Sequence, residues 1–412
     1  MSIWARLRAA TAQLFFRYFF RLLFVAASAA QWAVFTWVAG VGFGAWPPRW
    51  VHVLGVGGFY ACNRALIGSS PRRRGRLFRT YTATAFIALF CSAFLLTTAL
   101  AFLLAQGALG VLSAEALTEA GPASRLGAGL DGAFRWVASL GMAAIALTLG
   151  YGYVLGQRAL RVTRIALPLP GLRPGGRPLR IAQLSDIHVG RNLTVAELQA
   201  FVARVNATVP DLICVTGDIA DSPAADYAAF FPVLAELRAR FGVYAILGNH
   251  DHYAGADRVV AALRRWTSIR VLRDSAMTVD VDGAHLHVIG LDDRGRDWAR
   301  GVQSDSRLAA LLEAAPAEMP VLLLAHRPDI FHQAAAAGVA LTLSGHTHGG
   351  QLAIPWFGGR RRNLAEFITR FDRGLYRWGD SCLYVNCGLG VTGQRIRLFT
   401  PREISVFELT PA

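Results

Sequence analysis

The chain contains no lysine and little charge of either sign. Charged residues make up 17% of its 412 residues and hydrophobic residues 54%, whereas an average globular domain carries about 25% charged residues. This shortage of charge argues against a chain built only of soluble domains and favours a membrane portion. The absence of lysine supports no functional inference.

Cysteine is also scarce, and its spacing excludes two common uses. The five cysteines are Cys62, Cys91, Cys214, Cys382 and Cys387. No two of them form a C-x-x-C pair, which excludes a zinc ribbon and a thioredoxin-like redox motif. Cys214 lies in an apolar strand pattern, so we expect a buried thiol there. Nothing in the spacing indicates a disulfide framework.

The net charge of +15 is distributed unevenly along the chain. Residues 1–165 contain 16 arginines and 3 acidic residues, while the remainder contains 26 arginines and 24 acidic residues. A nucleic-acid-binding protein would carry its basic surplus on the soluble domain. The surplus here belongs to the hydrophobic part, so we expect no nucleic-acid partner.

Long uncharged segments lie within the first 165 residues. Residues 22–48, 80–114 and 136–157 carry no charged side chain, and a membrane-spanning helix needs about 20 mostly apolar residues. Residues 50–67 are a weaker candidate, because they are glycine-rich and contain a histidine and an arginine. The first segment is too long for the apolar part of a signal peptide, which has about 7–15 residues.

The arginines indicate how many of these segments cross the membrane, because cytoplasmic flanks of membrane helices collect Lys and Arg. Arginines cluster at residues 6–21, 72–79 and 158–164, whereas residues 105–133 hold three acidic residues and one arginine. All three clusters lie on the cytoplasmic side only if four helices span. The sequence therefore predicts a multi-pass protein of the bacterial inner membrane, with about four helices, the lipid bilayer as a partner and a cytoplasmic catalytic domain.

A proline- and glycine-rich stretch follows the hydrophobic part. Residues 166–179 read ALPLPGLRPGGRPL, a composition typical of a hinge. We therefore expect a transmembrane helical region at residues 1–165, a linker at 166–179 and a catalytic domain at 180–412.

Short apolar runs alternate with helical patterns beyond this linker. The expected strands are residues 181–184, 212–216, 243–247, 285–289, 321–325, 341–344, 383–386 and 404–409. The expected helices include residues 194–206, 224–240 and 257–266. This alternation predicts an α/β domain with its strands in the core.

Carboxylate, amide and imidazole side chains follow these strands directly, in the motifs LSDIHVG, VTGDIAD, LGNHD, LLLAHRPD and LSGHTHGG. They are Asp186, His188, Asp218, Asn249, His250, Asp251, His326, His346 and His348. Ligand sites in open α/β sheets lie beyond the carboxyl ends of strands. A single histidine after a strand is usually structural, but an ordered set from five strands indicates one shared site.

The residue types in this set suit metal binding. Imidazole, carboxylate and amide groups suit manganese, iron or zinc, and the lack of a thiolate argues against a structural zinc site. Seven ligand groups are too many for one ion with open positions. They suit two ions that share a carboxylate, and two ions about 3.5–4 Å apart stabilise the attacking and leaving oxygens of a phosphoryl displacement.

The motif set resembles the calcineurin-like metallophosphoesterase superfamily over residues 178–409. The wording of SDIHVG, GVYAILGNHD, LLAHRPD, SGHTHGGQ and YVNCGLGVTGQRIRLFTPREI is similar to the branch that contains the YkuE-like bacterial enzymes and the transmembrane metallophosphoesterase-domain proteins. The resemblance implies a sandwich of two central β-sheets flanked by helices. No motif position is substituted, which argues against an inactive relative.

The resemblance also implies a role for each motif residue. The first metal would be held by Asp186, His188 and His348, and the second by Asn249, His326 and His346. Asp218 would bridge the two ions. His250 would lie near the phosphate without binding metal, with Asp251 orienting it. Two divalent ions are expected, with manganese first and iron, zinc or magnesium as alternatives.

The expected reaction is hydrolysis of a phosphodiester or pyrophosphate bond by attack of a metal-bridging hydroxide. Lipid-linked phosphoesters are the first substrate class to consider, and broad action on soluble nucleotides is the second. A third hypothesis is a metal-binding regulatory domain on a membrane sensor. That hypothesis predicts ionisable residues inside the spans, and the three clear spans contain none. No protein partner is indicated.

One further segment combines aromatic residues with arginine. Residues 354–378 contain six arginines and the aromatic residues Trp356, Phe357, Phe367, Phe371, Tyr376 and Trp378. This composition suits a membrane interface with anionic headgroups. It suits equally well an ordinary surface loop that packs its aromatic side chains inward.

Overall fold

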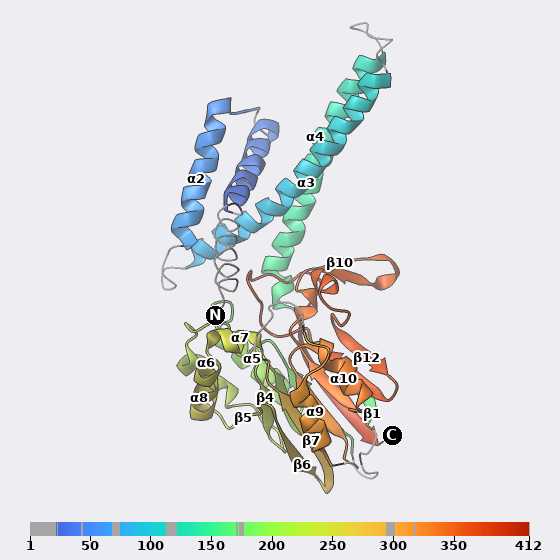
Figure 1. Cartoon of the computed structure of the whole chain (residues 1–412). Coiled ribbons are helices and arrows are strands. Elements are labelled where there is room, and N and C mark those ends of the chain that lie inside the picture. The colour runs from blue at the N-terminus through green and yellow to red at the C-terminus, as the bar shows by residue number, and fades with distance from the viewer. Residues whose placement is uncertain are drawn as a thin grey trace, which may run out of the picture. The chain divides into compact units, whose positions relative to one another are not determined.

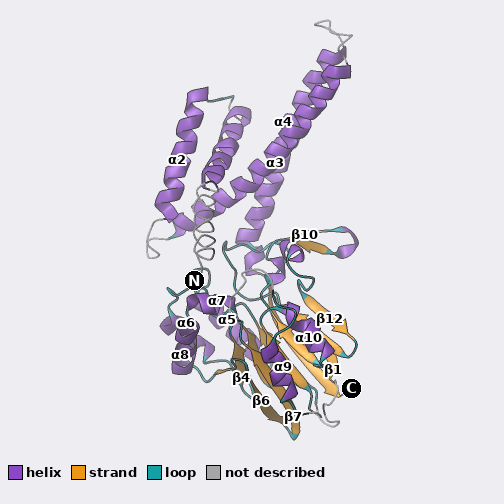
Figure 2. Ribbon diagram, viewed as in Figure 1, coloured by secondary structure: helices purple, strands orange, loops and turns teal. Residues whose placement is uncertain are grey.

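The structure is a computed structural model, shown in Figures 1 and 2. It describes residues 22, 24–42, 44–67, 75–112, 122–169, 172, 177–293, 301–316 and 319–411. The chain divides into two compact units, Met1–Gly150 and Tyr151–Ala412. The arginines expected at residues 6–21 and 72–74, and the acidic residues Glu115 and Glu119, lie outside the described residues.

The first unit is helical, as the uncharged segments predict. Besides a helix at Phe24–Gly42, it contains α2 (Arg49–Ile67), α3 (Arg76–Leu112) and most of α4 (Pro122–Val154). Among the described residues, three helical segments are long and apolar enough to cross a membrane: Phe24–Gly42, Leu77–Ala108 and Gly129–Arg158. The weak segment forms α2, a helix of 19 residues that is not one of these three.

Polar side chains of α2 are hydrogen-bonded to neighbouring helices. The Asn63 side-chain amide donates to Ser28 Oγ at 2.9 Å and to Gln31 Oε1 at 2.8 Å, and Tyr81 donates to Asn63 Oδ1 at 2.8 Å. A polar group in an apolar surrounding needs such partners. The network explains how a helix with weak hydrophobicity joins this unit, because its polar residues face the adjacent helices.

The second unit is built on two six-stranded mixed sheets. The first has the order β1 (Leu160–Leu169), β14 (Arg402–Pro411), β2 (Leu179–Leu184), β3 (Leu212–Thr216), β4 (Val243–Ile246) and β5 (Arg270–Val271). The second has the order β12 (Gly374–Trp378), β13 (Ser381–Val385), β9 (Leu341–Ser344), β8 (Val321–Ala325), β7 (Ala284–Leu291) and β6 (Ser275–Val281). Strands β2 to β5 are parallel to one another, as are β7, β8, β9 and β13.

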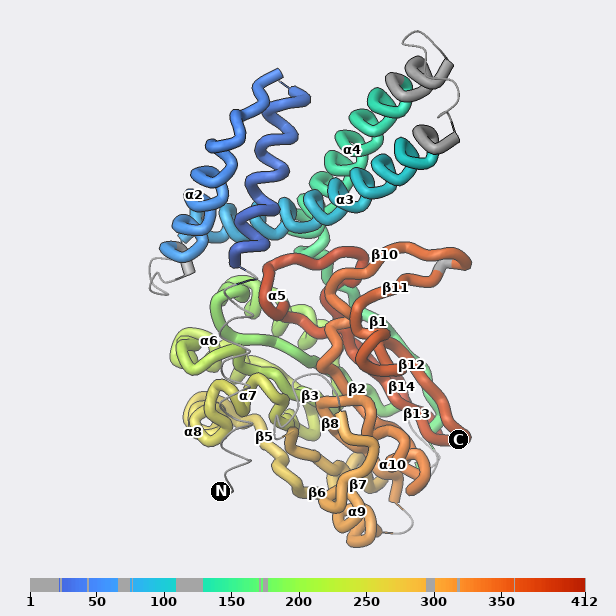
Figure 3. The backbone as a smooth tube through the Cα atoms, turned by 45° about the horizontal axis from the view of Figure 1, so that its top comes forward, coloured from blue at the N-terminus to red at the C-terminus, as the bar shows by residue number. Residues whose placement is uncertain are grey.

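Helices cover the outer face of each sheet, as Figures 1 and 3 show. On the first sheet they are α5 (Val195–Asn206), α6 (Tyr227–Leu234), α7 (Asn249–Ala254) and α8 (Ala256–Trp266). On the second they are α9 (Ser306–Glu313) and α10 (Phe331–Ala336). Between β9 and β12 the chain forms a short hairpin of β10 (Ala353–Pro355) and β11 (Arg361–Asn363), which pair with each other.

Alternation along each central strand divides its side chains between two cores. In β3, Leu212 and Cys214 pack between the two sheets, whereas Ile213 and Val215 pack under the helices. Both faces of the strand are buried, because successive side chains point to opposite faces of a sheet. This arrangement is the predicted sandwich of two sheets flanked by helices, and the buried Cys214 thiol is also as predicted.

The first sheet begins earlier in the chain than the expected domain boundary at residue 180. Strand β1 runs parallel to β14 from the pair Leu160–Arg402 to the pair Leu169–Pro411. It therefore includes the first four residues of the segment expected to be a linker. Leu167 and Leu169 are buried between the sheets, while Ala166 and Pro168 are exposed. This is the alternating pattern of a strand with one exposed face.

Replacing Leu167 with Ala is expected to lower the free energy of unfolding of the α/β unit by about 2–5 kcal/mol, because it leaves a cavity between the sheets. The measurement is urea-induced unfolding of the full chain in nanodiscs, followed by pulse proteolysis. Arg164→Ala is the matched control, since Arg164 is exposed on the same strand and surface changes stay within about 0.5 kcal/mol. An unchanged midpoint for Leu167→Ala would show that β1 is not part of the folded sheet.

Candidate metal centre

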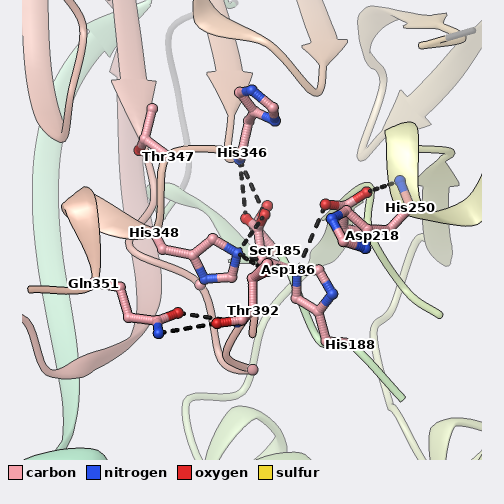
Figure 4. Close-up of polar contacts among 12 residues, drawn as sticks. Ser185, Asp186, His188, Asp218, His250, His346, Thr347, His348, Gln351 and Thr392 are labelled. Carbon is pink, nitrogen blue, oxygen red and sulfur yellow. Dashed lines mark hydrogen bonds and ion pairs between the residues drawn. The ribbon is translucent and has the colours of Figure 1, made fainter. Parts of the chain in front are cut away.

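The motif residues lie together at the carboxyl ends of five strands, and Figure 4 shows most of them. The loop after β2 carries Asp186 and His188, the loop after β3 carries Asp218, and the start of α7 after β4 carries Asn249 and His250. His326 follows β8 directly, and His346 and His348 follow β9. Parallel strands deliver all of these loops to one edge, which is why residues far apart in sequence meet there.

Five of these residues have a left-handed backbone. The φ angles are 49° at Asp186, 51° at His188, 51° at Asp218, 70° at His346 and 52° at His348. Non-glycine residues in this region carry a cost of order 1–3 kcal/mol each and persist only where the surroundings enforce them. Their concentration at one edge therefore indicates a functional site.

Two glycines allow the loops to approach the buried carboxylates. A Cβ at Gly248 would lie 2.2 Å from Asp218 Oδ1, and a Cβ at Gly345 would lie 2.3 Å from Asp186 Oδ2. His346, the residue after Gly345, donates its backbone N–H to Asp186 Oδ1 at 3.1 Å. His250, two residues after Gly248, donates its backbone N–H to Asp218 Oδ1 at 2.8 Å.

Three overlapping groups of described residues could each hold a metal ion: His188 with Asp221 and His250, and two further groups that share Asp186. Of these two, the first consists of Asp186, His188 and His348, and the second of Asp186, Asp218 and His326. Within the first group, Nε2 of His188 and Nε2 of His348 are 3.0 Å apart. Within the second, Nε2 of His326 lies 3.3 Å from Asp218 Oδ2. The same carboxylate oxygen of Asp218 lies 3.6 Å from Nε2 of His188, so Asp218 stands between the two groups.

Three buried polar atoms at this place have no hydrogen-bond partner in the structure: His188 Nδ1, Asn249 Oδ1 and His326 Nε2. The two histidine nitrogens face carboxylate oxygens at 3.3 Å, and Asn249 Oδ1 faces no donor among the described residues. Buried polar groups are almost always hydrogen-bonded, so unsatisfied atoms in a native site require a reason such as a bound ion. An amide oxygen and an imidazole nitrogen both bind divalent cations. The residues present therefore fit a divalent metal, and the clusters found among the described residues use carboxylate and imidazole ligands without a thiolate.

The buried carboxylates differ in the direction of their pKa shifts. Burial raises the pKa of Asp186 above its ordinary value. Burial would also raise the pKa of Asp218, but the facing imidazoles of His326, His188 and His250 hold it well below the usual range. Burial alone would lower the pKa of His326, yet Asp218 and Asp186 raise it to about 10. The site is thus a place where negative charge is buried and positive charge is held close to it.

His346 contributes its backbone to this site, and its ring lies beside another ligand. Its ring centroid is 5.1 Å from that of His326, in an edge-to-face arrangement. In Figure 4 the ring points away from the Asp186 carboxylate, while the backbone nitrogen points toward it. His346 is not a member of any of the candidate metal-binding groups formed by the described residues. The structure therefore places its ring at the edge of the site, beside His326.

Asp221 faces His250, a contact that was not expected from the sequence. Asp221 Oδ1 lies 3.4 Å from His250 Nδ1 and 3.3 Å from His188 Nδ1. Asp251, expected to orient His250, accepts instead the backbone N–H groups of Gly248, Ile219 and Ala220 at 2.8–3.1 Å. The reason is geometric, because Asp251 occupies the first turn of α7 with its carboxylate turned back over the start of the helix.

These contacts set the charge on the two partners. Burial alone would raise the pKa of Asp221, but its contacts with two imidazoles hold that pKa well below the usual range. Burial alone would lower the pKa of His250, and the contact with Asp221 raises it above its ordinary value. Asp221 is the last residue of the motif VTGDIAD, so its position in that motif was the available signal.

Thr392 is a second contact that sequence reasoning missed. Its Oγ1 lies 3.2 Å from Nε2 of both His188 and His348. Gln351 holds it in place, since Gln351 Oε1 accepts the Thr392 backbone N–H at 2.9 Å and Gln351 Nε2 donates to the Thr392 carbonyl at 3.1 Å (Figure 4). Thr392 lies in the segment GLGVTGQ after β13, which carries no ionisable side chain to draw attention to it.

A buried arginine fixes the loop after β13 beneath the site. Arg397 is fully buried, and its Nη2 donates to the carbonyls of Cys387 at 2.8 Å and Gly390 at 2.7 Å. The same nitrogen lies 3.4 Å from His348 Nδ1. Burial lowers the pKa of Arg397 to about 10, so the guanidinium stays charged at neutral pH.

Comparison with known proteins places the chain beside phosphoesterases. The family model described as calcineurin-like phosphoesterase matches residues 179–350. The chain is 34% identical over 282 residues to a protein of Bacillus subtilis named as the uncharacterized metallophosphoesterase YkuE, a match covering 65% of this chain and 93% of the relative.

Two further relatives carry more specific names. The chain is 31% identical to a protein of Bos taurus named as a transmembrane protein with metallophosphoesterase domain, over 61% of this chain and 57% of the relative. It is 27% identical to the Escherichia coli protein named phosphodiesterase YaeI, over 65% of this chain and 95% of the relative. The chain thus spans little more than half of the bovine relative.

Replacing Gly248 with Ala is expected to reduce bound metal, because the new Cβ would displace the Asp218 carboxylate from 2.2 Å away. The measurement is metal content of the purified full chain by elemental analysis. Gly338→Ala is the matched control, since Gly338 has a φ of +74° and open space around it. Full metal content in folded Gly248→Ala would contradict the placement of the metal ligands.

Replacing Asp221 with Asn is expected to lower the pKa of His250, because the charge that favours the imidazolium is removed. His250 would then lose its proton at a lower pH than in the original chain. The measurement is an NMR titration of selectively labelled histidine in the metal-free full chain. Asp257→Asn, an exposed carboxylate at the start of α8, serves as the control. An unchanged His250 titration in Asp221→Asn would show that Asp221 does not set its charge.

Proposed function

The chain belongs to the calcineurin-like phosphoesterase family, and from this premise we propose that it is a membrane-anchored phosphohydrolase with a two-metal centre. Phosphodiesters and pyrophosphates are the proposed bonds. Lipid-linked phosphoesters are the substrate class that best matches an enzyme anchored in a bilayer. Members of this family use divalent metals, and the identity of the metal here is proposed to be manganese first.

One observation carries the two-metal proposal. A single oxygen of Asp218 lies 3.3 Å from Nε2 of His326 and 3.6 Å from Nε2 of His188. His188 belongs to the ligand group with Asp186 and His348, and His326 to the one with Asp186 and Asp218. A carboxylate between two sets of imidazoles is the arrangement that a shared ligand of two ions requires.

The ligands of the two ions are assigned on this basis. The first ion would be held by Asp186, His188 and His348, and the second by Asn249, His326 and His346, with Asp218 shared. Two observations support the second set: the buried oxygen Asn249 Oδ1 has no hydrogen-bond partner, and His326 Nε2 faces the shared carboxylate of Asp218 at 3.3 Å. His346 is kept in that set because its ring lies beside that of His326.

The ions would lower the pKa of a shared water and neutralise charge on the phosphoryl oxygens. The chain itself supplies the remaining parts. The buried carboxylates keep the ions in place. Asp221 lies 3.3 Å from Nδ1 of His188 and orients that imidazole with Nε2 toward His348 and Asp218. Such partners fix which nitrogen of a histidine is available to a metal.

His250 is proposed as the proton donor to the leaving group. It is partly exposed, so a substrate at the rim can reach it, and its Nδ1 faces Asp221. That contact raises the pKa of His250 and favours the imidazolium. The opposite ring nitrogen, Nε2, then holds a proton for the departing oxygen, a role that general acids fill when placed within hydrogen-bond reach.

The proposed location follows from the helical unit and the arginines. Three helices are long and apolar enough to cross a membrane, and a relative is named as a transmembrane protein. Arg158 ends the last candidate span, and Arg161 and Arg164 follow it. By the tendency of arginine to stay on the cytoplasmic side, we place the catalytic domain in the cytoplasm and the helices in the bacterial inner membrane.

Purified full chain in nanodiscs is expected to hold about two divalent ions and to hydrolyse a chromogenic phosphoester in a metal-dependent manner. Asp218→Ala should lose both ions and the activity, because the shared ligand is removed. The measurement is elemental analysis together with turnover of bis-para-nitrophenyl phosphate and para-nitrophenyl phosphate. Stoichiometric metal without turnover on any phosphoester, including lipid phosphoesters, would overturn the enzymatic proposal.

The same assay separates the proton donor from the metal ligands. His250→Ala is expected to retain its metal and to lower kcat by about 100- to 10,000-fold, with the larger losses for poor leaving groups. His252→Ala is a suitable comparison, because His252 lies near the same motif but pairs with Asp292 at 2.9 Å. Loss of metal from His250→Ala would assign His250 to the ligands instead.

A further inference from the structure

The segment after the last metal-ligand motif projects an apolar hairpin from the α/β unit. This hairpin, residues 353–368, comprises β10, β11 and two short helical turns, η5 (Phe357–Gly359) and η6 (Leu364–Phe367). Figure 3 shows β10 and β11 extending away from the two sheets. It begins five residues after His348, so it is continuous with the rim of the site.

Large apolar side chains of the hairpin face solvent. They are Ile354, Trp356, Phe357, Leu364 and Phe367, and Phe357 and Phe367 are 84% and 80% exposed. Trp356 and Phe357 contact each other edge to face, with ring centroids 5.6 Å apart. A soluble protein rarely exposes so many large apolar groups in one short segment unless they meet a partner or a membrane.

The rest of the aromatic segment behaves differently. Phe371 is buried, and its ring centroid lies 5.8 Å from that of Phe331 and 5.1 Å from that of Tyr376. The segment therefore contains inward-packed aromatics that belong to the core and outward-facing ones on the hairpin. The membrane-interface interpretation of the sequence thus suits the hairpin, and the inward-packing interpretation suits the residues that follow it.

The base of the hairpin is fixed to the domain. The Ala353 backbone N–H donates to the Leu398 carbonyl at 2.9 Å, and Asn363 Nδ2 donates to Asp372 Oδ2 at 2.6 Å. A Cβ at Gly350 would lie 2.3 Å from Asn363 Oδ1. Asn363, at the end of β11, therefore packs closely against the turn that follows His348. A firmly held base with an exposed apolar tip is the geometry of an inserting element.

The hairpin and the segment behind it carry an excess of positive charge. Residues 353–378 contain six arginines and two acidic residues. Arg360, Arg361, Arg362, Arg370 and Arg377 are exposed. Arginines beside exposed tryptophan and phenylalanine match a bilayer surface that carries anionic headgroups. Like charges would oppose the meeting of two such hairpins from two copies of the chain.

The chain connection keeps the domain close to a bilayer. The last candidate span ends at Arg158, and β1 begins at Leu160. One intervening residue spans at most about 3.6 Å. In the proposed location of the helices, this short connection tethers the α/β unit to the bilayer and raises the local concentration of lipid around the hairpin.

We propose that the hairpin of residues 353–368 is a second membrane contact, inserting its apolar tip into an anionic lipid surface. Trp356 and Phe357 at the tip enter the interfacial layer, and the neighbouring arginines bind the lipid phosphates. The contact holds the rim that carries His346 and His348 at the lipid surface. The proposal rests on the exposed side chains of the hairpin and on the short connection to the last candidate span, and it does not depend on the proposed catalysis.

The test places an environment-sensitive fluorophore at the tip of the hairpin in the full chain. Phe357→Cys is made together with Cys62→Ser, because Cys62 is exposed and the other four cysteines are buried. The labelled chain is reconstituted in vesicles of phosphatidylcholine and phosphatidylglycerol that contain nitroxide-labelled lipid. Fluorescence quenching by the nitroxide reports contact with lipid, and the readout needs no substrate.

Val209→Cys in the same background is the matched control. Val209 is 69% exposed and precedes β3, at the edge of the sheets opposite the metal ligands. We expect several-fold stronger quenching at position 357 than at position 209. Equal quenching at the two positions would overturn the proposal. So would shielding of position 357 from aqueous iodide without lipid quenching, because that result would indicate a protein partner.

The role of charge is tested in the same vesicles. Replacing Arg360 and Arg362 with Gln, or omitting phosphatidylglycerol, is expected to reduce the quenching at position 357. Undiminished quenching in both cases would overturn the anionic part of the proposal. Because metal content is measured on the same samples, a failed lipid contact is distinguished from a failed metal site.

Discussion

The structure depends on the burial of two carboxylates, Asp186 and Asp218, at the edge where five strands end. Among the residues that the structure describes, the charged partners of these carboxylates are imidazoles rather than arginines. Burying a carboxylate is costly unless positive charge and hydrogen bonds surround it. The left-handed turns, the close glycines and the backbone N–H groups of His250 and His346 all serve this requirement.

The candidate site could be located from sequence because its residues follow strands at a fixed offset. Strands β3, β8 and β9 begin and end where the apolar runs predicted, and the motif residues come directly after them. Asp221 and Thr392 could not be assigned in this way. Their contacts with His188 depend on how three separate loops turn over the edge, and no pattern of local spacing encodes that path. The same path places Asp221, 3.4 Å away, opposite Nδ1 of His250.

Other parts of the fold depended on partners distant in sequence. The sequence of β1 predicts only the end of the membrane region and the start of a linker. Its pairing with β14 joins residues about 240 positions apart, so no local pattern indicates it. Helix α2 has weak hydrophobicity, and only the arginine pattern suggested it. The hydrogen bonds from Asn63 to Ser28 and Gln31 explain how this helix packs with its neighbouring helices. Short elements such as α9 and α10 carry too little periodicity to be detected.

The pairing of β1 with β14 also bears on the order in which the chain is completed during translation. Leu160 leaves the ribosome about 240 residues before its partner Arg402. At roughly 5–20 residues per second, this interval is on the order of tens of seconds. Throughout this interval the edge strand lacks its only sheet neighbour, because, among the described strands, β1 pairs with β14 alone. The candidate spans are therefore all synthesised well before the first sheet can be completed.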